Sequence, residues 1–271
     1  KFDIPYTKAA GEFILNYLIK VKVNTEFFEN NLKINLADFD SKKASKLPVT
    51  FEEFIEEVEK LKELFEKNKR KWIKLSSEKE FDLAEFNLSL IDQFVQRLIK
   101  KNERDVVGYM NHRDSCMAEN IEKILSWEGK SSRMVVWSHN LHLQKTDNKG
   151  VRQMGFYLDN ILGEQFYSVA SDFRTGRFRA ITGKILKETF LEEIPKNSIA
   201  AKLTQFNPQS AFYDFKSMKI NNEFFNSMLE IHRIGLVFTE AKNAFAKVEL
   251  KKEFDGLIFI YPATHSTTPL K

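Results

Sequence analysis

The segment Arg133-Met134-Val135-Val136-Trp137-Ser138-His139-Asn140-Leu141-His142 carries the strongest structural signal in this chain. A short apolar run with β-branched residues at its centre leads into two histidines separated by two residues, and polar, glycine-containing sequence follows. This pattern predicts a buried strand over residues 134–138 that presents reactive side chains at its C-terminal end. Because open α/β sheets bind ligands beyond the carboxyl ends of their strands, we expect a functional site there.

The composition narrows the class of protein. A chain of 271 residues with 42% hydrophobic residues can form one large domain or two small ones. The net charge of +4 is small and dispersed, which argues against a nucleic-acid partner. A single cysteine, Cys116, excludes an internal disulfide and a thiolate zinc site. No apolar run approaches the roughly 20 residues of a membrane span and no signal peptide is visible, so we expect a cytoplasmic protein without a membrane partner.

Residues 1–128 have the apolar spacing of helices and predict a helical subdomain with lead-in helices. Stripes follow Pro5, begin again behind Thr50, and recur after a break at Ser76-Ser77. Thr50 and Glu53 have the form of a capping box. A further helix is expected from about residue 106 to Trp127, with Gly129 as its C-cap.

Residues 129–271 change in character and predict an α/β sheet part that carries the histidine segment. Strands are expected to alternate with short helices, which favours an α/β class with a mostly parallel sheet, flanking helices and some antiparallel edge. The expected helices cover residues 153–162 and 198–204, and the further expected strands cover residues 165–170, 178–181, 211–215, 231–238 and 254–261.

His139 and His142 are the leading candidates for chemistry. Imidazole titrates near neutral pH, so either residue could take a proton from water or protonate a leaving alkoxide. Two histidines three residues apart could also bind a metal, although no third ligand is visible in the sequence. An equally weighted alternative places one histidine in a hydrogen-bonded core and the other in solvent. His232 and His265 are isolated and are weaker candidates.

The helix before this segment contains a second candidate group, Arg113-Asp114, which is a structural pair, a chance surface neighbour or part of a pocket. Arg113 and Met117 share a helix face, so Arg113 could point toward a pocket that Met117 helps to form. The polar stretch at residues 145–151 is either a loop that closes over a substrate or an ordinary connection.

These elements, taken in order, resemble the erythromycin esterase-like hydrolases. The resemblance rests on Arg113-Asp114 with Met117-Ala118-Glu119-Asn120, on Ser138-His139-Asn140-Leu141-His142, and on Met154-Gly155. It extends through Ile234-Gly235, Phe254-Asp255-Gly256-Leu257-Ile258 and Thr267-Thr268-Pro269, with a fainter similarity at Phe2-Asp3. The family includes macrolide esterases associated with antibiotic resistance and relatives labelled for succinoglycan biosynthesis.

The resemblance implies hydrolysis of a small-molecule ester or lactone by activated water, with no cofactor and no metal. It implies that His139 and His142 are catalytic, and we expect Arg113, Asn140 and Met154 to bind substrate. The family's Gly-Glu-x-x-His-Gly motif, which carries the proposed base, is absent. We therefore expect this chain to need the remaining N-terminal half of the same protein as a partner. The alternatives are a non-catalytic fragment or degenerate relative, and a metal-dependent hydrolase.

Overall fold

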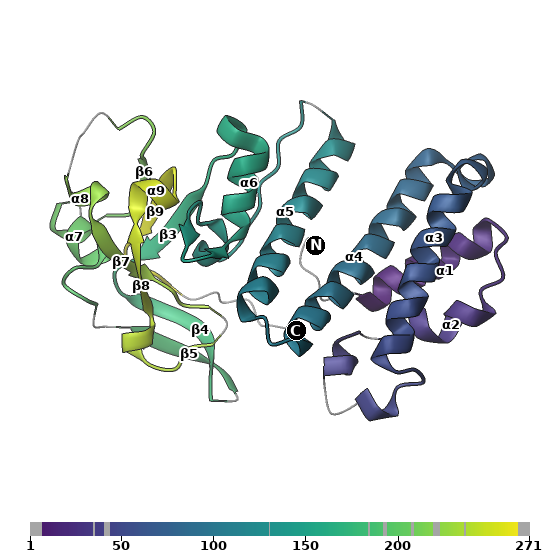
Figure 1. Cartoon of the computed structure of the whole chain (residues 1–271). Helices are drawn as coiled ribbons and strands as arrows, with labels where there is room; N and C mark the ends of the chain where they lie inside the picture. The colour runs from purple at the N-terminus through teal and green to yellow at the C-terminus, as the bar shows by residue number, and fades with distance from the viewer. Residues whose placement is uncertain are drawn as a thin grey trace. The chain divides into compact units, whose positions relative to one another are not determined.

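The computed structural model describes residues 7–34, 36–40, 44–129, 131–183, 185–191, 194–206, 209–218, 223–235 and 237–264 (Figure 1). His265 and the segments Phe2-Asp3 and Thr267-Thr268-Pro269 lie outside these residues. The chain divides into two compact units, Lys1–Ile121 and Glu122–Lys271. No helix among the described residues is long and apolar enough to span a bilayer.

The first unit, here called the helical unit, contains no strand among its described residues. Its helices are α1 (Thr7–Lys20), α2 (Glu26–Leu32), α3 (Phe51–Leu75), α4 (Glu78–Asn102) and most of α5 (Val106–Glu128), with short 3-10 helices at Leu36–Asp40 and Ala44–Lys46. The helices predicted after Pro5, behind Thr50, after Ser76-Ser77 and from about residue 106 are confirmed.

Local signals set the ends of the long helices. The predicted capping box is present at the start of α3, where the Thr50 side chain accepts a hydrogen bond from the Glu53 N–H and the Glu53 carboxylate accepts one from the Thr50 N–H. The Ser77 side chain accepts from the Glu80 N–H at the start of α4. Beyond α5, Gly129 has φ +95°, the left-handed conformation that favours glycine after a helix.

Apolar stripes on these helices form the core of the helical unit. Helix α4 packs against both α1 and α3. The largest fully buried side chains in this core are aromatic and aliphatic, and they include Phe54, Leu61, Phe65, Trp72, Phe81 and Ile91. In α1 the buried face differs slightly from the prediction, because Ala9 and Phe13 are exposed while Ala10 and Leu15 are buried.

The second unit, here called the sheet unit, contains short strands in several small sheets. A three-stranded sheet has the order β3 (Val169–Phe173), β9 (Gly256–Ile260), β6 (Ala211–Asp214). Three antiparallel pairs join β1 (Asp147–Asn148) to β2 (Val151–Arg152), β4 (Gly176–Thr182) to β5 (Ile185–Leu191), and β7 (Met228–His232) to β8 (Phe245–Glu249). The helices are the end of α5, α6 (Met154–Leu162), α7 (Ile199–Phe206), α8 (Glu223–Asn226) and α9 (Leu250–Glu253).

The prediction of a mostly parallel sheet does not hold for the described residues. Strands β3 and β9 are parallel, whereas the other ladders between named strands of the described residues are antiparallel. Three isolated bridges, Gly176 with Ala263, Ile181 with Val237 and Ser198 with Glu230, are parallel. Two expected strands are also displaced along the chain, since β3 lies at Val169–Phe173 and β7 at Met228–His232. The displacement of β3 adds the buried Asp172 to that strand, and His232 is buried at the end of β7.

The predicted strand at residues 134–138 is absent, which corrects the central expectation from the sequence. The chain is extended there, but its backbone makes no hydrogen bond with any described residue. Exposure still alternates along it: Val135 is 93% exposed and Trp137 is 84% exposed, while Met134 and Val136 are half-buried. The expected burial is therefore wrong at Val135 and Trp137, and no neighbouring strand among the described residues pairs with this segment.

Candidate active site

His139 ends the extended segment and begins a short 3-10 helix, η3 (Asn140–Leu143). Its ring caps this helix, because Nδ1 accepts a hydrogen bond of 3.1 Å from the Leu141 N–H. The other ring nitrogen, Nε2, lies 3.0 Å from the Ile234 carbonyl oxygen. A carbonyl can only accept, so Nε2 carries the proton and Nδ1 does not. His139 is therefore a neutral imidazole with both nitrogens hydrogen-bonded.

The surroundings of His139 favour this neutral state. Burial lowers the pKa of His139, although its hydrogen bond to the Ile234 carbonyl raises that pKa in part. Electrostatic interactions with His142 and Arg233 lower the pKa of His139 further. Arg233, which lines the cavity with His139, is a cation and attracts anions.

Asn140 fixes the same turn to the edge of strand β3. Its side-chain amide donates to the Ser171 carbonyl at 2.7 Å, and its carbonyl oxygen accepts from the Ser171 N–H at 2.9 Å. The amide thus satisfies the backbone groups that a neighbouring strand would otherwise bond. This bidentate contact holds Asn140 in the wall of the site.

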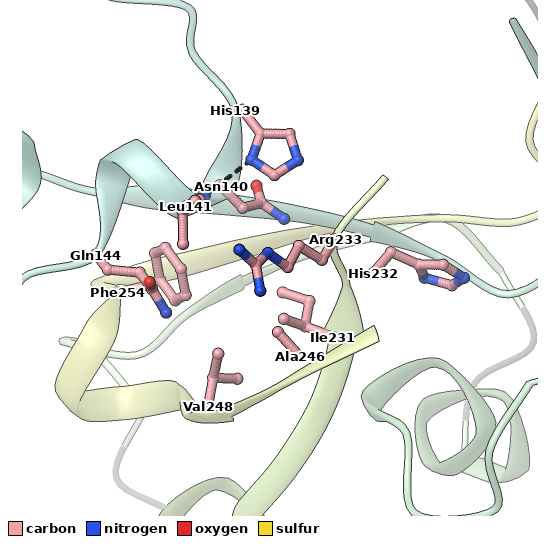
Figure 2. A pocket seen from close by; sticks show the side chains of 10 residues that line it. All are labelled: His139, Asn140, Leu141, Gln144, Ile231, His232, Arg233, Ala246, Val248 and Phe254. Atoms are coloured by element: carbon pink, nitrogen blue, oxygen red, sulfur yellow. Dashed lines mark hydrogen bonds between the residues drawn. The ribbon is translucent and has the colours of Figure 1, made fainter. Parts of the chain in front are cut away.

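A small cavity lies beside this turn, with about 240 Å³ of empty space that is partly open to solvent. Its lining comes from η3, from strands β7 and β8 and from the residues that follow them: His139, Asn140, Leu141, Gln144, Ile231, His232, Arg233, Ala246, Val248 and Phe254. No aspartate or glutamate is among these residues. Figure 2 shows the Arg233 guanidinium extending between Asn140 and Leu141 on one side and Ile231 on the other, while the ring of His232 points away from this group.

The structure brings some of the predicted site residues together. His139 and Asn140 line the cavity, and His142 is half-buried in the adjoining helix η3. Met154 is fully buried at the start of α6, which packs against η3. Arg113 belongs to the helical unit, where its Nη1 atom lies 4.0 Å from Asp114 Oδ2.

The stretch at residues 145–151 contributes to a small hairpin, β1–β2, and ion pairs of Lys145 attach the start of this stretch to the rest of the sheet unit. The ammonium group of Lys145 lies 3.0 Å from Asp255 Oδ1 and 2.9 Å from Asp159 Oδ1. Asp255 also accepts a hydrogen bond from the Ser168 N–H at 2.7 Å. Closure of this stretch over a substrate stays a prediction.

Sequence reasoning missed two features of this region. The first is Arg233, which lies two residues after Ile231 and therefore on the same face of an extended chain. A cation at the end of this apolar face was the sequence signal that could have identified it. The second feature is a buried pair in which His232 Nδ1 contacts Asp172 Oδ1. The His232 ring is sandwiched by aromatics, with Phe173 stacked at a centroid distance of 4.2 Å. No sequence motif marks this pair, because its members are 60 residues apart.

The described residues do not form a set of metal-binding side chains. Among the described residues no group of three or more His, Cys, Asp or Glu side chains is placed to hold one ion. His139 is a poor ligand in the observed conformation, because metal binding needs an unprotonated ring nitrogen and its Nδ1 lone pair is occupied by the Leu141 N–H.

Comparison with solved structures shows a shared fold. A Bacillus cereus protein of known structure superposes with a TM-score of 0.72 at 20% identity, covering 97% of this chain and 65% of its own. A succinoglycan biosynthesis protein gives 0.66 at 17% identity, covering 97% of this chain and 64% of its own. A mutant of the erythromycin esterase EreC in its open conformation gives 0.69 at 15% identity, covering 99% of this chain and 70% of its own.

Comparison at the sequence level points the same way. The Bacillus subtilis protein YbfO, whose name assigns it provisionally to the hydrolases, is 25% identical over 162 residues, which are 57% of this chain and 35% of YbfO. The chain thus spans about a third of YbfO and just under two thirds of the Bacillus cereus structure. The family model for erythromycin esterase matches residues 2–262. This chain therefore belongs to the erythromycin esterase family.

Proposed function

We propose that the longer protein to which this chain corresponds hydrolyses a carboxylic ester or lactone with water. The observation that carries the proposal is the His139–His142 turn, which in a member of this family lies beside a cavity that Arg233 also lines. The hydrolase label on YbfO and the esterase label on EreC support the same reaction class.

In this reaction the oxygen of water bonds to the carbonyl carbon, and the bond from that carbon to the leaving oxygen breaks. We assign the proton transfer to the leaving alkoxide to His142. His139 is the weaker donor, since its Nε2–H already bonds to the Ile234 carbonyl and its Nδ1 accepts from Leu141. His139 instead serves as a positioning residue that caps η3 and so places His142. The base that activates water is assigned to the part of the family fold that this chain does not cover.

The cavity limits which part of a substrate this chain can hold. The cavity is small, and its empty space of about 240 Å³ includes space that is open to solvent, whereas pockets that bury a drug-sized ligand are larger and mostly enclosed. It can receive a small acyl group but not an entire macrolide. Macrolide hydrolysis, and with it a role in antibiotic resistance, therefore requires further walls from the longer protein. Arg113 and Met154 remain proposed substrate contacts on the resemblance alone.

The test measures hydrolysis of p-nitrophenyl acetate and of erythromycin by the full-length protein. We expect His142→Ala to lower kcat by about 10²-fold, the usual contribution of a general acid. His139→Ala should lower the melting temperature as well as kcat, because it removes the cap of η3. Lys247→Ala, an exposed change on the neighbouring strand β8, is the control for folding and handling. Unchanged turnover in His142→Ala, with the control also unchanged, would refute the assignment.

A second candidate function is a non-catalytic binding module. The observation in its favour is that both ring nitrogens of His139 are hydrogen-bonded, so this conformation holds no second proton-transfer group beside His142. Ester hydrolysis at an enzyme-like rate by the 271-residue chain alone would exclude this reading. A full-length protein that binds esters without turning them over would favour it.

A further inference from the structure

The cavity beside η3 is lined by one cation, Arg233, whose side chain has no protein partner in the part of the chain that the structure describes. Among the described residues the Arg233 side chain makes no ion pair and donates no hydrogen bond, although its backbone N–H bonds to the Ala244 carbonyl at 2.6 Å. Arg233 is exposed overall, yet its guanidinium extends into the space between η3 and the β7–β8 hairpin (Figure 2). An arginine that lines a cavity without a carboxylate is available for an anion from outside.

The other residues of the cavity wall determine which kind of anion fits beside Arg233. Ile231, Ala246, Val248 and Phe254 contribute apolar surface, while the Asn140 amide is already bonded to Ser171. Phosphate and sulfate carry more charge and need several donors, which this wall lacks. A single carboxylate with a short apolar tail matches one guanidinium fork and an apolar wall.

We propose that this cavity is a monocarboxylate-binding site, in which Arg233 holds the carboxylate through its guanidinium and the β7–β8 wall holds a short aliphatic tail. The biological role of this site rests on the proposed function, because ester hydrolysis releases such a carboxylate. In that reaction the cavity would hold the acyl end of the substrate or the carboxylate product. The binding itself does not depend on catalysis.

The affinity is modest, because an exposed ion pair contributes little in water. We expect dissociation constants of about 1–10 mM for butyrate, equivalent to weak small-ligand binding. Each added CH₂ group that becomes buried should tighten binding by about fourfold, from acetate to propionate to butyrate.

The test is an NMR titration of amide and arginine side-chain signals with acetate, propionate and butyrate at constant ionic strength. We expect the signals of Arg233 and Ala246 to shift and affinity to rise with tail length. Arg233→Met should weaken butyrate binding at least about tenfold, and Arg233→Lys should weaken it several-fold because the planar fork is lost. The matched control is Lys247→Met, which removes one positive charge from the same hairpin on the opposite strand face and should leave binding within about twofold.

Several results would overturn the proposal. They are butyrate binding that is undiminished in both Arg233 variants, an equal loss in Lys247→Met, tighter binding of phosphate or sulfate than of butyrate, and equal binding of butylammonium. The dispersion of the amide spectrum shows whether Arg233→Met is folded, and Arg233→Lys keeps the test valid if it is not. Because no turnover is measured, loss of ester hydrolysis in the His142 variant leaves these results unaffected, and the two proposals can fail separately.

Discussion

The two units of this chain are stabilised in different ways. In the helical unit, α3 and α4 satisfy their backbone groups internally and contribute apolar stripes to one core. In the sheet unit, polar side chains connect segments far apart in sequence. The Asp255 carboxylate accepts from the Ser168 N–H, the Asn140 amide pairs with the Ser171 backbone, and Asp172 contacts His232.

This difference follows from the length of the elements. A helix of 25 residues makes its own hydrogen bonds, so its position depends mainly on burial of its apolar face. Strands of four or five residues leave many backbone groups to be satisfied by other segments. The sheet unit should therefore be most sensitive to loss of a buried polar contact, and the helical unit to loss of buried apolar volume.

The largest expected effect concerns the helical unit. Phe65 is 2% exposed, and its ring lies edge-on to Trp72 at a centroid distance of 5.0 Å. Phe65→Ala should lower the free energy of unfolding by about 4 kcal/mol, through lost burial and the cavity left behind. Urea unfolding followed by tryptophan fluorescence measures it. Phe13→Ala on α1 is the control, because Phe13 is 39% exposed and its loss should change stability by less than about 0.5 kcal/mol. Equal effects would contradict the assigned core.

The matching experiment on the sheet unit removes one member of the Asp172–His232 pair. Both side chains are buried, and neither His232 Nε2 nor Asp172 Oδ2 has a hydrogen-bond partner among the residues that the structure describes. Asp172→Asn should cost about 3 kcal/mol, because His232 loses its charged partner inside the protein. Replacing both residues, with Asp172→Leu and His232→Phe, should cost less than the single change. A double variant at least as unstable as the single one would show that the pair itself is not what matters.

The same contrast explains how much the sequence could predict. Helix ends at Thr50 and Ser77 and the stripes between them are local signals, so the helical unit was largely predicted. Residues 134–138 carry a valid strand pattern, but a strand also requires a neighbour, and the alternation of exposure cannot reveal whether one is present. Strands β5 and β8 were missed because their burial depends on pairing partners that no local pattern specifies.

The candidate site was predicted to the same extent. His139 and Asn140 were identified and do line the cavity, since they belong to one contiguous segment. Asp172 lies 33 residues beyond His139 along the chain, and His232 and Arg233 lie 93 and 94 residues beyond it, so only folding brings them to this region. Their roles could not be read from spacing.

A smaller effect is expected at the start of α3. Thr50→Ala removes the side-chain oxygen that accepts from the Glu53 N–H, and it should lower the free energy of unfolding by about 1 kcal/mol. Thr50→Ser keeps the oxygen and should remain within a few tenths of a kcal/mol of the wild type. Thermal unfolding by circular dichroism at 222 nm measures both. If the serine variant loses as much as the alanine variant, the capping box does not contribute to stability.

The smallest expected effect is on the pH dependence of the free energy of unfolding. One buried group in each unit contributes to it, and the two contributions have opposite signs. Burial lowers the pKa of His139 below 6.5, so the unfolded chain takes up its proton more readily. The stability from a neutral His139 is therefore complete above pH 6.5 and is lost as the pH falls through the lower, folded-state pKa. In the helical unit, burial raises the pKa of Glu57 above 4.5, so the folded state takes up that proton more readily. Its contribution is present below pH 4.5 and is lost as the pH rises through the folded-state pKa.

Urea unfolding at pH 7.0 and pH 5.0 separates these two contributions. On acidification, His139→Gln should lose less stability than the wild type, because the variant has no imidazole to protonate on unfolding. Glu57→Gln should lose more than the wild type, because it lacks the carboxyl group whose protonation favours the folded state. The two variants must therefore depart from the wild type in opposite directions. Departures of the same sign would mean that at least one of these side chains does not have the buried environment assigned to it, since desolvation disfavours the charged form of both groups.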